Sequence, residues 1–514
     1  MHGFGDGLPL SAEGFIIDNG SMTSTLIDQW AAETRSRATG VAAALLMLWF
    51  LAAPASAVAD EPCPRGAIAV EPGASIQAAV NLAGEGAAFC LKNGVHRMQA
   101  VRPKRGQSFH GEAKTVLNGS RLLTTFSREG RYWVVTGQAQ RAQHVGICAK
   151  ETPACKLTEG FFIDDKPLTQ ALSKDSVEPG RFYFDHARGR ISFADDPTGR
   201  KVETTVAPFA FEGAAPGVLI RNVVVEKYAS AAQKGAIQAQ ESSGWVIENC
   251  EVRLNSGAGI AVGKGSRVRG CDIHHNGQIG ITGAGQDILI ENNRVWDNNI
   301  RGFDRGWEAG GVKIALGDGV LFRNNHVHDN VGPGLWCDIN CRNVTYEGNL
   351  VEQNHGSGIF HEISFDAVIR NNVVRHNGIG DRRWFWGADI LVAASQHVEI
   401  YGNTLTVSAG GCGIILIDQS RLMDGGGKYK TRNNTVHNNK MTFEGSLCAG
   451  GASDADPGDE NFSIITDGNN LFDGNIYRVP RASGPARFAW GHEVFDWDGL
   501  RGKGVEPHGQ LLVY

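Results

Sequence analysis

From about residue 217 onward, short apolar runs alternate with polar turns at a regular interval. Each unit contains a strand-like run, a three-residue turn such as Arg323-Asn324-Asn325, and one or two further apolar residues. The third residues of nine successive turns are separated by 27, 21, 22, 32, 24, 23, 31 and 31 residues. A base period of 21 to 24 residues with short strands is typical of one coil of a right-handed parallel β-helix.

The turn asparagines fit this interpretation, because Asn tolerates left-handed backbone geometry and its amide can bond to the Asn of the next coil. A leucine-rich horseshoe is excluded because no L-x-x-L-x-L frame recurs and helical segments are missing. The repeats of a β-propeller would be about twice as long. Val, Ile and Leu at inward positions would stack into one continuous core.

The first half of the chain follows a different pattern. Residues 75–83 predict a short helix that caps the N-terminal end of the coils. Residues 122–206 contain alternating strands between Gly and Asp turns, which suggests an inserted β-sandwich. We therefore predict an all-β fold, a right-handed parallel β-helix solenoid with an N-terminal capping helix and an inserted small β-sandwich. The predicted parts are 1–57 (a spurious extension and a signal peptide), 58–121 (capping helix and first coils), 122–206 (inserted sandwich), 207–440 (main β-helix with its active-face loops) and 441–514 (final coils and tail).

Residues 41–53 form the one strongly apolar run of the chain. Its thirteen residues are too few to span a bilayer, which needs about 20. Arg35 and Arg37 precede the run and Ala55-Ser56-Ala57 follows it, which predicts a secretory signal peptide rather than a membrane anchor. Met22 is better placed than Met1 as the first residue of this signal peptide. We expect a secreted or periplasmic protein that has no membrane attachment after cleavage of the signal.

Ten cysteines agree with export to an oxidising compartment. Suggestive pairs are Cys63 with Cys90, Cys148 with Cys155, Cys412 with Cys448, and Cys337 with Cys341. The 49 basic and 55 acidic residues give a net charge of -6, which argues against a nucleic-acid partner. The 67 glycines follow no G-X-Y period, so collagen is excluded.

Two consecutive coils align without gaps at an offset of 24 residues, 334–340 with 358–364. Strand alternation predicts that every second side chain points inward. The inward rungs would be Leu335 with Ile359, Cys337 with His361, and Ile339 with Ile363. His361 is therefore expected to be a buried structural histidine, whereas His274 and His275 lie at a turn and are expected at the surface.

The outward rungs of the same coils carry the candidate chemistry. Trp336 stacks under Phe360, Asp338 stacks under Glu362, and Lys313 of the preceding coil lies below Trp336. Carboxyl groups on adjacent rungs come within about 5 Å, so one pKa should rise. A separation of about 5 to 5.5 Å is the geometry of a retaining glycosidase. We predict Asp338 and Glu362 as catalytic residues, with the aromatic pair as a sugar-stacking surface and Lys313 as an orienting group.

Two long intervals place loops beside this pair. One contains Arg301, Asp304, Trp307 and Glu308, and the other, 381–386, contains Trp384. Aromatic and charged loops beside a strand face make a groove, and we expect all five residues to bind substrate. Arg301 and Arg305, together with Arg382 and Arg383 of the second loop, would make the groove locally basic.

The repeats resemble the secreted right-handed parallel β-helix superfamily of pectate lyases, polygalacturonases, alginate epimerases and several glycosidases. A closer resemblance lies in Gly334-Leu335-Trp336-x-Asp338 and Phe360-x-Glu362, which look like the β-helical retaining β-xylosidase type. This resemblance implies Asp338 as nucleophile and Glu362 as general acid/base. The Asp-Pro-His signature of alginate epimerases and the Arg-x-Pro-x-x-Arg signature of pectate lyases are absent.

These observations predict a carbohydrate-active enzyme, a glycoside hydrolase that acts on a poly- or oligosaccharide as a monomer without a cofactor. The first alternative is a polysaccharide lyase or epimerase, in which the two carboxylates hold Ca²⁺ or neutralise a uronate and Lys313 or a loop arginine takes the proton. The second alternative is a non-catalytic glycan-binding protein. The sequence does not identify the sugar.

Overall fold

The structure, a computed structural model, describes residues 63–514 except 142, 381–383 and 482–486. The predicted signal peptide and N-terminal extension lie outside these residues. In the described part of the chain, no helix is long and apolar enough to cross a membrane.

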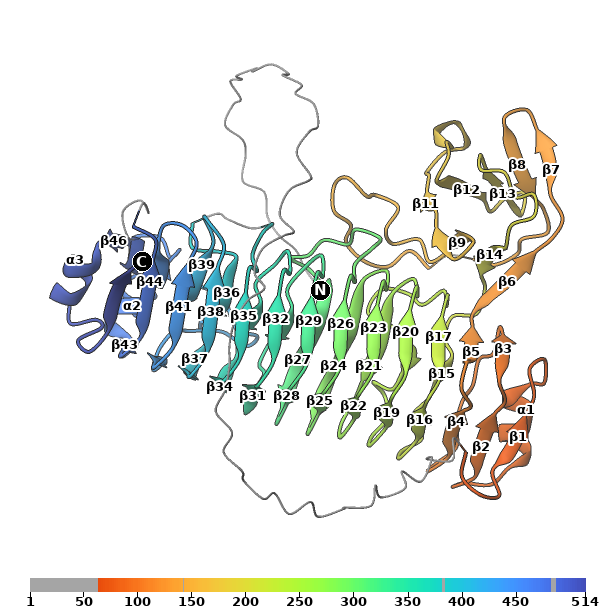
Figure 1. The fold of residues 1–514 in the computed structure, drawn as a ribbon, viewed down its shortest axis with the longest axis horizontal. Helices are drawn as coiled ribbons and strands as arrows, with labels where there is room; N and C mark the ends of the chain where they lie inside the picture. Colours follow the sequence, from red (N-terminus) through yellow and green to blue (C-terminus); the bar gives the residue numbers. More distant parts are fainter. Residues whose placement is uncertain (1–62, 142, 381–383, 482–486) are drawn as a thin grey trace, which may run out of the picture. The chain divides into compact units, whose positions relative to one another are not determined.

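Three long sheets form the faces of a stack of coils, and successive coils contribute successive strands to each sheet (Figure 1). The sheet that carries the candidate site, here called the cleft sheet, is parallel except at its last strand. Its strands are β15(Phe211–Glu212), β18(Gly235–Gln238), β21(Ala258–Val262), β24(Ile279–Gln286), β27(Gly310–Asp318), β30(Leu335–Asp338), β33(Ile359–Glu362), β36(Ala388–Ala393), β39(Cys412–Asp418), β42(Cys448–Ser453), β45(Arg487–Gly491) and β46(Glu493–Phe495).

The other two long sheets have 13 strands each. One contains β1(Ile68–Val70), β2(Ala88–Leu91), β4(Ser108–Gly111), β16(Leu219–Arg221), β19(Val246–Glu248), β22(Arg267–Arg269), β25(Leu289–Glu291), β28(Leu321–Arg323), β31(Val344–Glu347), β34(Phe365–Arg370), β37(Gln396–Tyr401), β40(Thr435–His437) and β43(Leu471–Asp473). The other contains β3(Gly94–Arg97), β5(Thr115–Asn118), β17(Val224–Glu226), β20(Glu251–Arg253), β23(Asp272–His274), β26(Arg294–Trp296), β29(His326–His328), β32(Leu350–Glu352), β35(Val373–Arg375), β38(Thr404–Val407), β41(Lys440–Phe443), β44(Ile476–Val479) and β47(Gln510–Val513). The predicted parallel β-helix is confirmed.

The interior of the coils is a continuous stack of apolar side chains, mainly Val, Ile, Leu and Phe. Both ends of the stack are covered by short helices. At the N-terminal end, α1(Ile76–Leu82) begins at Ser75, whose hydroxyl accepts a hydrogen bond from the Ala78 N–H, and it buries Ile76 and Val80. At the other end, α3(Trp497–Gly502) buries Leu500, and the short α2(Ile464–Asp467) packs on the last coils. The predicted capping helix is therefore present.

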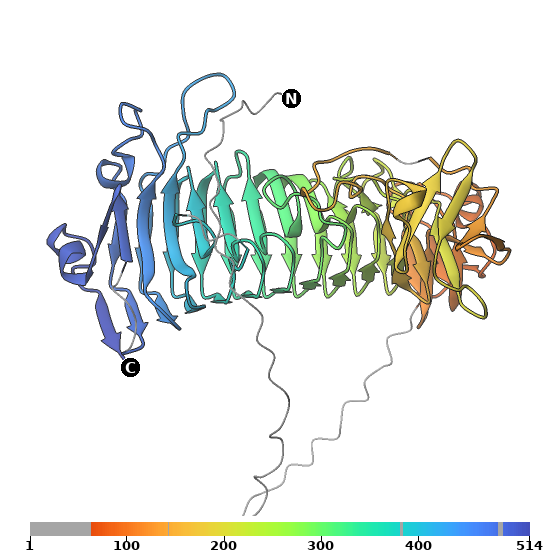
Figure 2. The same ribbon diagram turned by 90° about the horizontal axis from the view of Figure 1, so that it is seen from above.

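Asparagine ladders hold the turns of successive coils together. In one ladder, the side-chain amide of each Asn donates to the side-chain oxygen of the next, at 2.9–3.0 Å. It contains Asn293, Asn325, Asn349, Asn372, Asn403, Asn439 and Asn475. The preceding turn residue, for example Asn324 with a φ of 54°, has the left-handed conformation that Asn tolerates. Viewed from above, the coils follow one another in regular rows (Figure 2).

The inserted subdomain consists of two packed sheets beside the N-terminal coils (Figure 1). One sheet orders β10(Lys166–Pro167), β9(Phe161–Ile163), β14(Val202–Thr205) and β6(Ser120–Leu123). The other orders β11(Thr169–Gln170), β12(Arg181–Asp185), β13(Arg190–Phe193), β8(Tyr132–Val135) and β7(Ser127–Glu129), with the 3₁₀ turn η1(Lys174–Ser176) after β11. An aromatic core that includes Phe161, Phe182 and Phe193 lies between the sheets, as predicted for a small β-sandwich.

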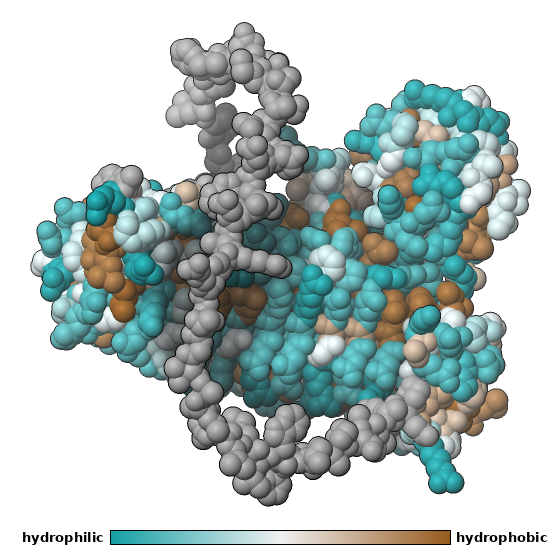
Figure 3. All heavy atoms as spheres, in the orientation of Figure 1, coloured by the Kyte–Doolittle hydropathy of each residue, from teal (hydrophilic) through white to brown (hydrophobic). Residues whose placement is uncertain are grey.

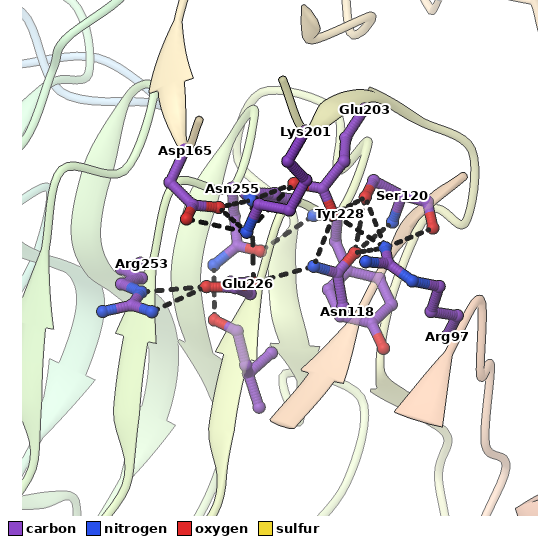
Figure 4. A network of polar contacts seen from close by, with 12 residues as sticks. Arg97, Asn118, Ser120, Asp165, Lys201, Glu203, Glu226, Tyr228, Arg253 and Asn255 are labelled. Atoms are coloured by element: carbon purple, nitrogen blue, oxygen red, sulfur yellow. Dashed lines mark hydrogen bonds and ion pairs between the residues drawn. The ribbon is translucent and has the colours of Figure 1, made fainter. Parts of the chain in front are cut away.

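A network of buried charges joins this subdomain to the coils (Figure 4). The Lys227 side chain is 0% exposed and its ammonium pairs with Glu203 of β14 and with Asp165. Arg97 of β3 contacts the Glu203 carboxylate at 2.7 Å. Burial alone would raise the pKa of Glu203, but Lys227 and Arg97 outweigh it and hold the pKa below its usual value.

All four cysteine pairs suggested by the sequence are disulfides: Cys63–Cys90, Cys148–Cys155, Cys337–Cys341 and Cys412–Cys448. Cys250 and Cys271 are buried as free thiols. Disulfides persist in oxidising compartments, and the four pairs are typical of proteins found there.

Two inward positions predicted by strict alternation are wrong. Ile339 is exposed, and Ile363 packs with Ala394 and Tyr429 outside the main core. The reason is local, because β30 and β33 end at Asp338 and Glu362 and the next residues have φ values of 53° and 39°. The left-handed turn breaks the alternation of a strand at the residue that follows each carboxylate.

Candidate functional site

The candidate site lies on three adjacent strands of the cleft sheet. β27, β30 and β33 pair in parallel, with Lys313 opposite Trp336 and Trp336 opposite Phe360. The pair Cys337–His361 then places Asp338 and Glu362 side by side at the ends of adjacent strands. The register is the one expected from the 24-residue offset.

Lys313 is the centre of a buried charge cluster. Its ammonium contacts Asp338 Oδ2 at 2.8 Å and Glu308 Oε2 at 3.1 Å, and donates to the Trp307 carbonyl at 3.0 Å. Burial alone would lower the pKa of Lys313, but the two carboxylates outweigh it and raise the pKa. The side chain is therefore a fixed cation.

Asp338 is buried, and its two carboxylate oxygens have different contacts. Oδ2 is held by Lys313, whereas Oδ1 has no hydrogen-bond partner within the described part of the chain. This carboxylate is oriented through one oxygen, but Oδ1 is buried and Asp338 does not line the cavity in front of Glu362, so a nucleophilic role requires the substrate to reach it from that cavity.

Glu362 is buried beside this carboxylate. Burial, followed by the negative charge of Asp338, raises its pKa to about 7, and Arg421 opposes the shift. Arg421 Nη1 lies 3.2 Å from Glu362 Oε1, and the Gln419 amide donates to the same oxygen at 3.4 Å. Asp338 is thus paired with a cation, whereas Glu362 has a pKa near neutral pH. Catalytic pairs of carboxyl groups commonly differ in this way, so that one acts as base or nucleophile and the other as acid.

A cavity of about 780 Å³ opens in front of Glu362. Trp336 and Phe360 line it, with ring centroids 5.3 Å apart and an interplanar angle of 21°. The Lys313 ammonium lies 3.6 Å from the centre of the Trp336 ring. Both rings are largely covered by neighbours, so they form the floor of the cavity.

The structure brings most of the predicted site residues together. Asp304 and the 41% exposed Trp384 line the cavity, and Glu308 is held near it by Lys313 and by the Thr282 hydroxyl at 3.0 Å. Trp307 contributes its carbonyl to Lys313, while its ring packs on Phe303.

Arg301 does not reach this cavity. Its guanidinium donates to the Glu159 carbonyl at 2.7 Å and lines a different cavity. Arg305 lines the site, whereas Arg382 and Arg383 lie outside the described residues. His361 is buried as predicted, because it points inward between Tyr346 and the Phe365 carbonyl, and burial lowers its pKa to about 4.

Sequence reasoning missed the wall formed by Gln419, Arg421 and Asp454. The first two lie directly after β39 and Asp454 directly after β42. The signal was present in the last 31-residue interval of the repeat, which contains an insertion at this position. Only the two intervals next to the aligned coils were interpreted as cleft loops.

The carboxylates fit Ca²⁺ poorly. Asp338 is paired with the Lys313 ammonium and Glu362 with the Arg421 guanidinium, so each already faces a cation. Calcium sites offer six to eight unopposed oxygens.

Comparisons with known proteins agree with the fold. A family model described as a right-handed beta helix region matches residues 235–405. The structure of XylC with xylose is 14% identical, with a TM-score of 0.60, and the match covers 86% of this chain and 82% of that chain. The A-module of mannuronan C-5 epimerase AlgE4 of Azotobacter vinelandii is 13% identical, with a TM-score of 0.45, over 73% of this chain and 92% of that chain. No curated protein matches the sequence. The family model and the XylC match confirm the right-handed β-helix fold.

Proposed function

We propose that this right-handed β-helix protein is a secreted retaining glycoside hydrolase, with Asp338 as nucleophile and Glu362 as general acid/base. The observation that carries the proposal is the unequal pair of buried carboxyl groups on adjacent strands. Asp338 is paired with the Lys313 ammonium at 2.8 Å, and Glu362 has a pKa raised to about 7. The four disulfides support export.

In the first step, Asp338 Oδ1 attacks the anomeric carbon and the glycosidic C–O bond breaks. The Glu362 proton passes to the departing oxygen, which leaves as an alcohol, and a glycosyl ester of Asp338 remains. In the second step, the Glu362 carboxylate takes a proton from water, whose oxygen attacks the anomeric carbon and releases Asp338. Two inversions give net retention of configuration.

The cavity favours a glycosidase over a lyase. In a lyase, a base must take a proton from the sugar, but Lys313 is held as a cation by Asp338 and Glu308. XylC, the structure with the higher TM-score of the two compared, contains xylose, so short β-xylosides are the first substrates to test. The walled cavity around Glu362 suits the end of a chain or an oligosaccharide.

The test is mass spectrometry of neutral and uronic oligosaccharides after incubation with the mature protein, with and without chelator. Hydrolysis adds one water to the fragments, whereas elimination adds none. Asp338→Asn and Glu362→Gln should each reduce turnover of oligosaccharides at least 1,000-fold, while Asp366→Asn, an exposed carboxylate outside the cavity, should retain it. Full activity in either site variant, or unsaturated fragments, contradicts the proposal, and an unchanged panel favours a binding protein.

A further inference from the structure

A second cavity, of about 490 Å³, lies where the inserted subdomain meets the coils. Three parts of the chain line it: the disulfide loop at 151–155, the strands β9 and β11 with their surroundings, and the coil turns at 254–256 and 300–301. It shares no lining residue with the cavity in front of Glu362. Figure 3 shows hydrophobic surface where the subdomain and the coils meet, in an otherwise mostly hydrophilic face.

Two buried polar side chains that line this cavity are unsatisfied. The side chain of Gln170 is 8% exposed and its Oε1 has no hydrogen-bond partner in the described structure. Glu159 is 2% exposed; its Oε1 lies 2.8 Å from His186 Nε2, and Oε2 has no hydrogen-bond partner among the described residues. Buried polar atoms without partners are rare in proteins, and a bound ligand or water is one explanation for them.

Arg301 supplies a positive charge to the same cavity. Its Nη2 donates to the Glu159 carbonyl at 2.7 Å. Burial lowers the pKa of Arg301 to about 10, so the guanidinium stays charged at neutral pH. The cavity therefore contains a guanidinium that donates, a carboxylate that accepts and an amide that can do both.

The rest of the wall is apolar. Phe161, Leu168 and Leu172 of the subdomain face Leu254 and Ile300 of the coil turns. A combination of an apolar wall and a few polar groups is typical of small-molecule sites, which occupy about 300–1,000 Å³.

We propose that this junction cavity is a second, non-catalytic binding site for a neutral oligosaccharide of two or three sugar units. A neutral ligand is required because Glu159 repels an anion and Arg301 repels a cation. Sugar hydroxyls both donate and accept, which matches Glu159, Gln170 and Arg301, and the C–H faces of sugar rings match the apolar wall. This site does not depend on the reaction assigned to Asp338 and Glu362.

The test is titration calorimetry of the full mature chain carrying Asp338→Asn, with xylotriose and maltotriose as separate probes. For at least one probe we expect binding at a site that is independent of the catalytic cavity. Gln170→Leu removes the unsatisfied acceptor, and Leu172→Trp, at a residue that is 60% exposed, blocks the cavity without disturbing the core. Each should weaken this binding at least tenfold, whereas Leu122→Trp, on an exposed position of β6 outside the cavity, should leave it unchanged.

Crystals of the same chain soaked with the binding trisaccharide should show it against Gln170. The proposal is overturned if neither probe binds outside the catalytic cavity, or if both cavity variants bind as tightly as the Leu122→Trp control. Because the substitutions lie outside the catalytic cavity, either result leaves the hydrolase proposal standing.

Discussion

At the scale of single residues, two carboxyl groups of similar chemistry acquire different properties from their neighbours. Asp338 faces an ammonium that is itself held by Glu308 and the Trp307 carbonyl. Glu362 is buried next to that negative charge, and Arg421, Lys313 and the Gln419 amide offset the shift only in part. The sequence could predict the pair from the strand register, but not that the pKa of Glu362 would be raised, because burial, the largest cause of that shift, depends on how the coils and loops pack.

The raised pKa of Glu362 predicts an alkaline limb in the pH profile. The acid must be protonated in the free enzyme, so kcat/KM should fall about tenfold per pH unit above about pH 7. Burial and the Asp338 charge are the causes. Measurement of kcat/KM between pH 5 and 9 on an alkyl β-xyloside checks this.

The control uses an aryl glycoside whose activated leaving group needs no proton. On this substrate, Glu362→Gln should keep its first step and lose the alkaline limb of the pH profile. An alkaline limb that is unchanged in this variant would exclude Glu362 as its source.

Arg421 provides a finer test of the same group. Its positive charge lowers the pKa of Glu362, so Arg421→Gln should move the alkaline limb to higher pH. Arg432→Gln is a matched control, because Arg432 follows the same loop but bonds to Gln396 outside the cavity. A limb that stays in place in both variants would show that Arg421 does not act on Glu362.

At the scale of elements, the periodic sequence pattern predicted the coils, because each coil needs the same kinds of residue at its turns and at its core-facing strand positions. Asn325 and Asn349 recur where a left-handed residue precedes a ladder position, and Leu335 and Ile359 recur where a strand faces the core. The prediction failed at Ile339, since a period-2 pattern contains no information on the residue at which a strand ends. The same left-handed turn follows both Asp338 and Glu362, which places the two carboxylates at strand ends.

A second ladder ends in an acid, and this predicts a pH-dependent stability. Asp389 Oδ1 accepts from the Asn377 backbone and amide, while Oδ2 is buried without a partner within the described residues. Burial raises the pKa of Asp389 from 3.8 to about 7. The folded state thus holds the proton more tightly than the unfolded state, so the contribution of Asp389 to stability is complete below pH 4 and is lost as the pH rises towards 7.

The loss in the free energy of unfolding is roughly 4 kcal/mol. Asp389→Asn keeps the Oδ1 acceptor and removes the charge, so its melting temperature should exceed that of the parent at pH 8 and match it at pH 4. The exposed Asp366→Asn serves as a control for general charge effects. Equal melting-temperature differences at both pH values would show that Asp389 does not titrate in this range.

At the scale of the whole molecule, the inserted subdomain and the long turn loops line the two cavities described above. The sequence predicted where the insertions occur, because they lengthen the repeat. It could not predict how they meet. Arg301 was expected at the catalytic cavity since it shares a loop with Glu308, yet its guanidinium bonds to Glu159 of the inserted subdomain. Contacts between segments about 140 residues apart leave no trace in a local pattern.

We expect the attachment of the subdomain to depend on Lys227, which is buried and pairs with Glu203 and Asp165 of the subdomain. Lys227→Met leaves Glu203 buried with Arg97 at 2.7 Å and Lys201 at 3.9 Å as its remaining cations. Removal of one partner of a buried ion pair costs about 3–5 kcal/mol, whereas removal of both costs much less. We therefore expect Lys227→Met to lower the melting temperature and to speed proteolytic release of the 120–205 segment. Lys227→Met combined with Glu203→Gln should recover most of both losses, because the charges that lose a partner in the double variant, Arg97 and Asp165, are partly exposed, whereas Glu203 is fully buried. If the double variant is as unstable as the single one, hydrogen bonding and packing by Lys227, rather than charge balance, hold the subdomain in place.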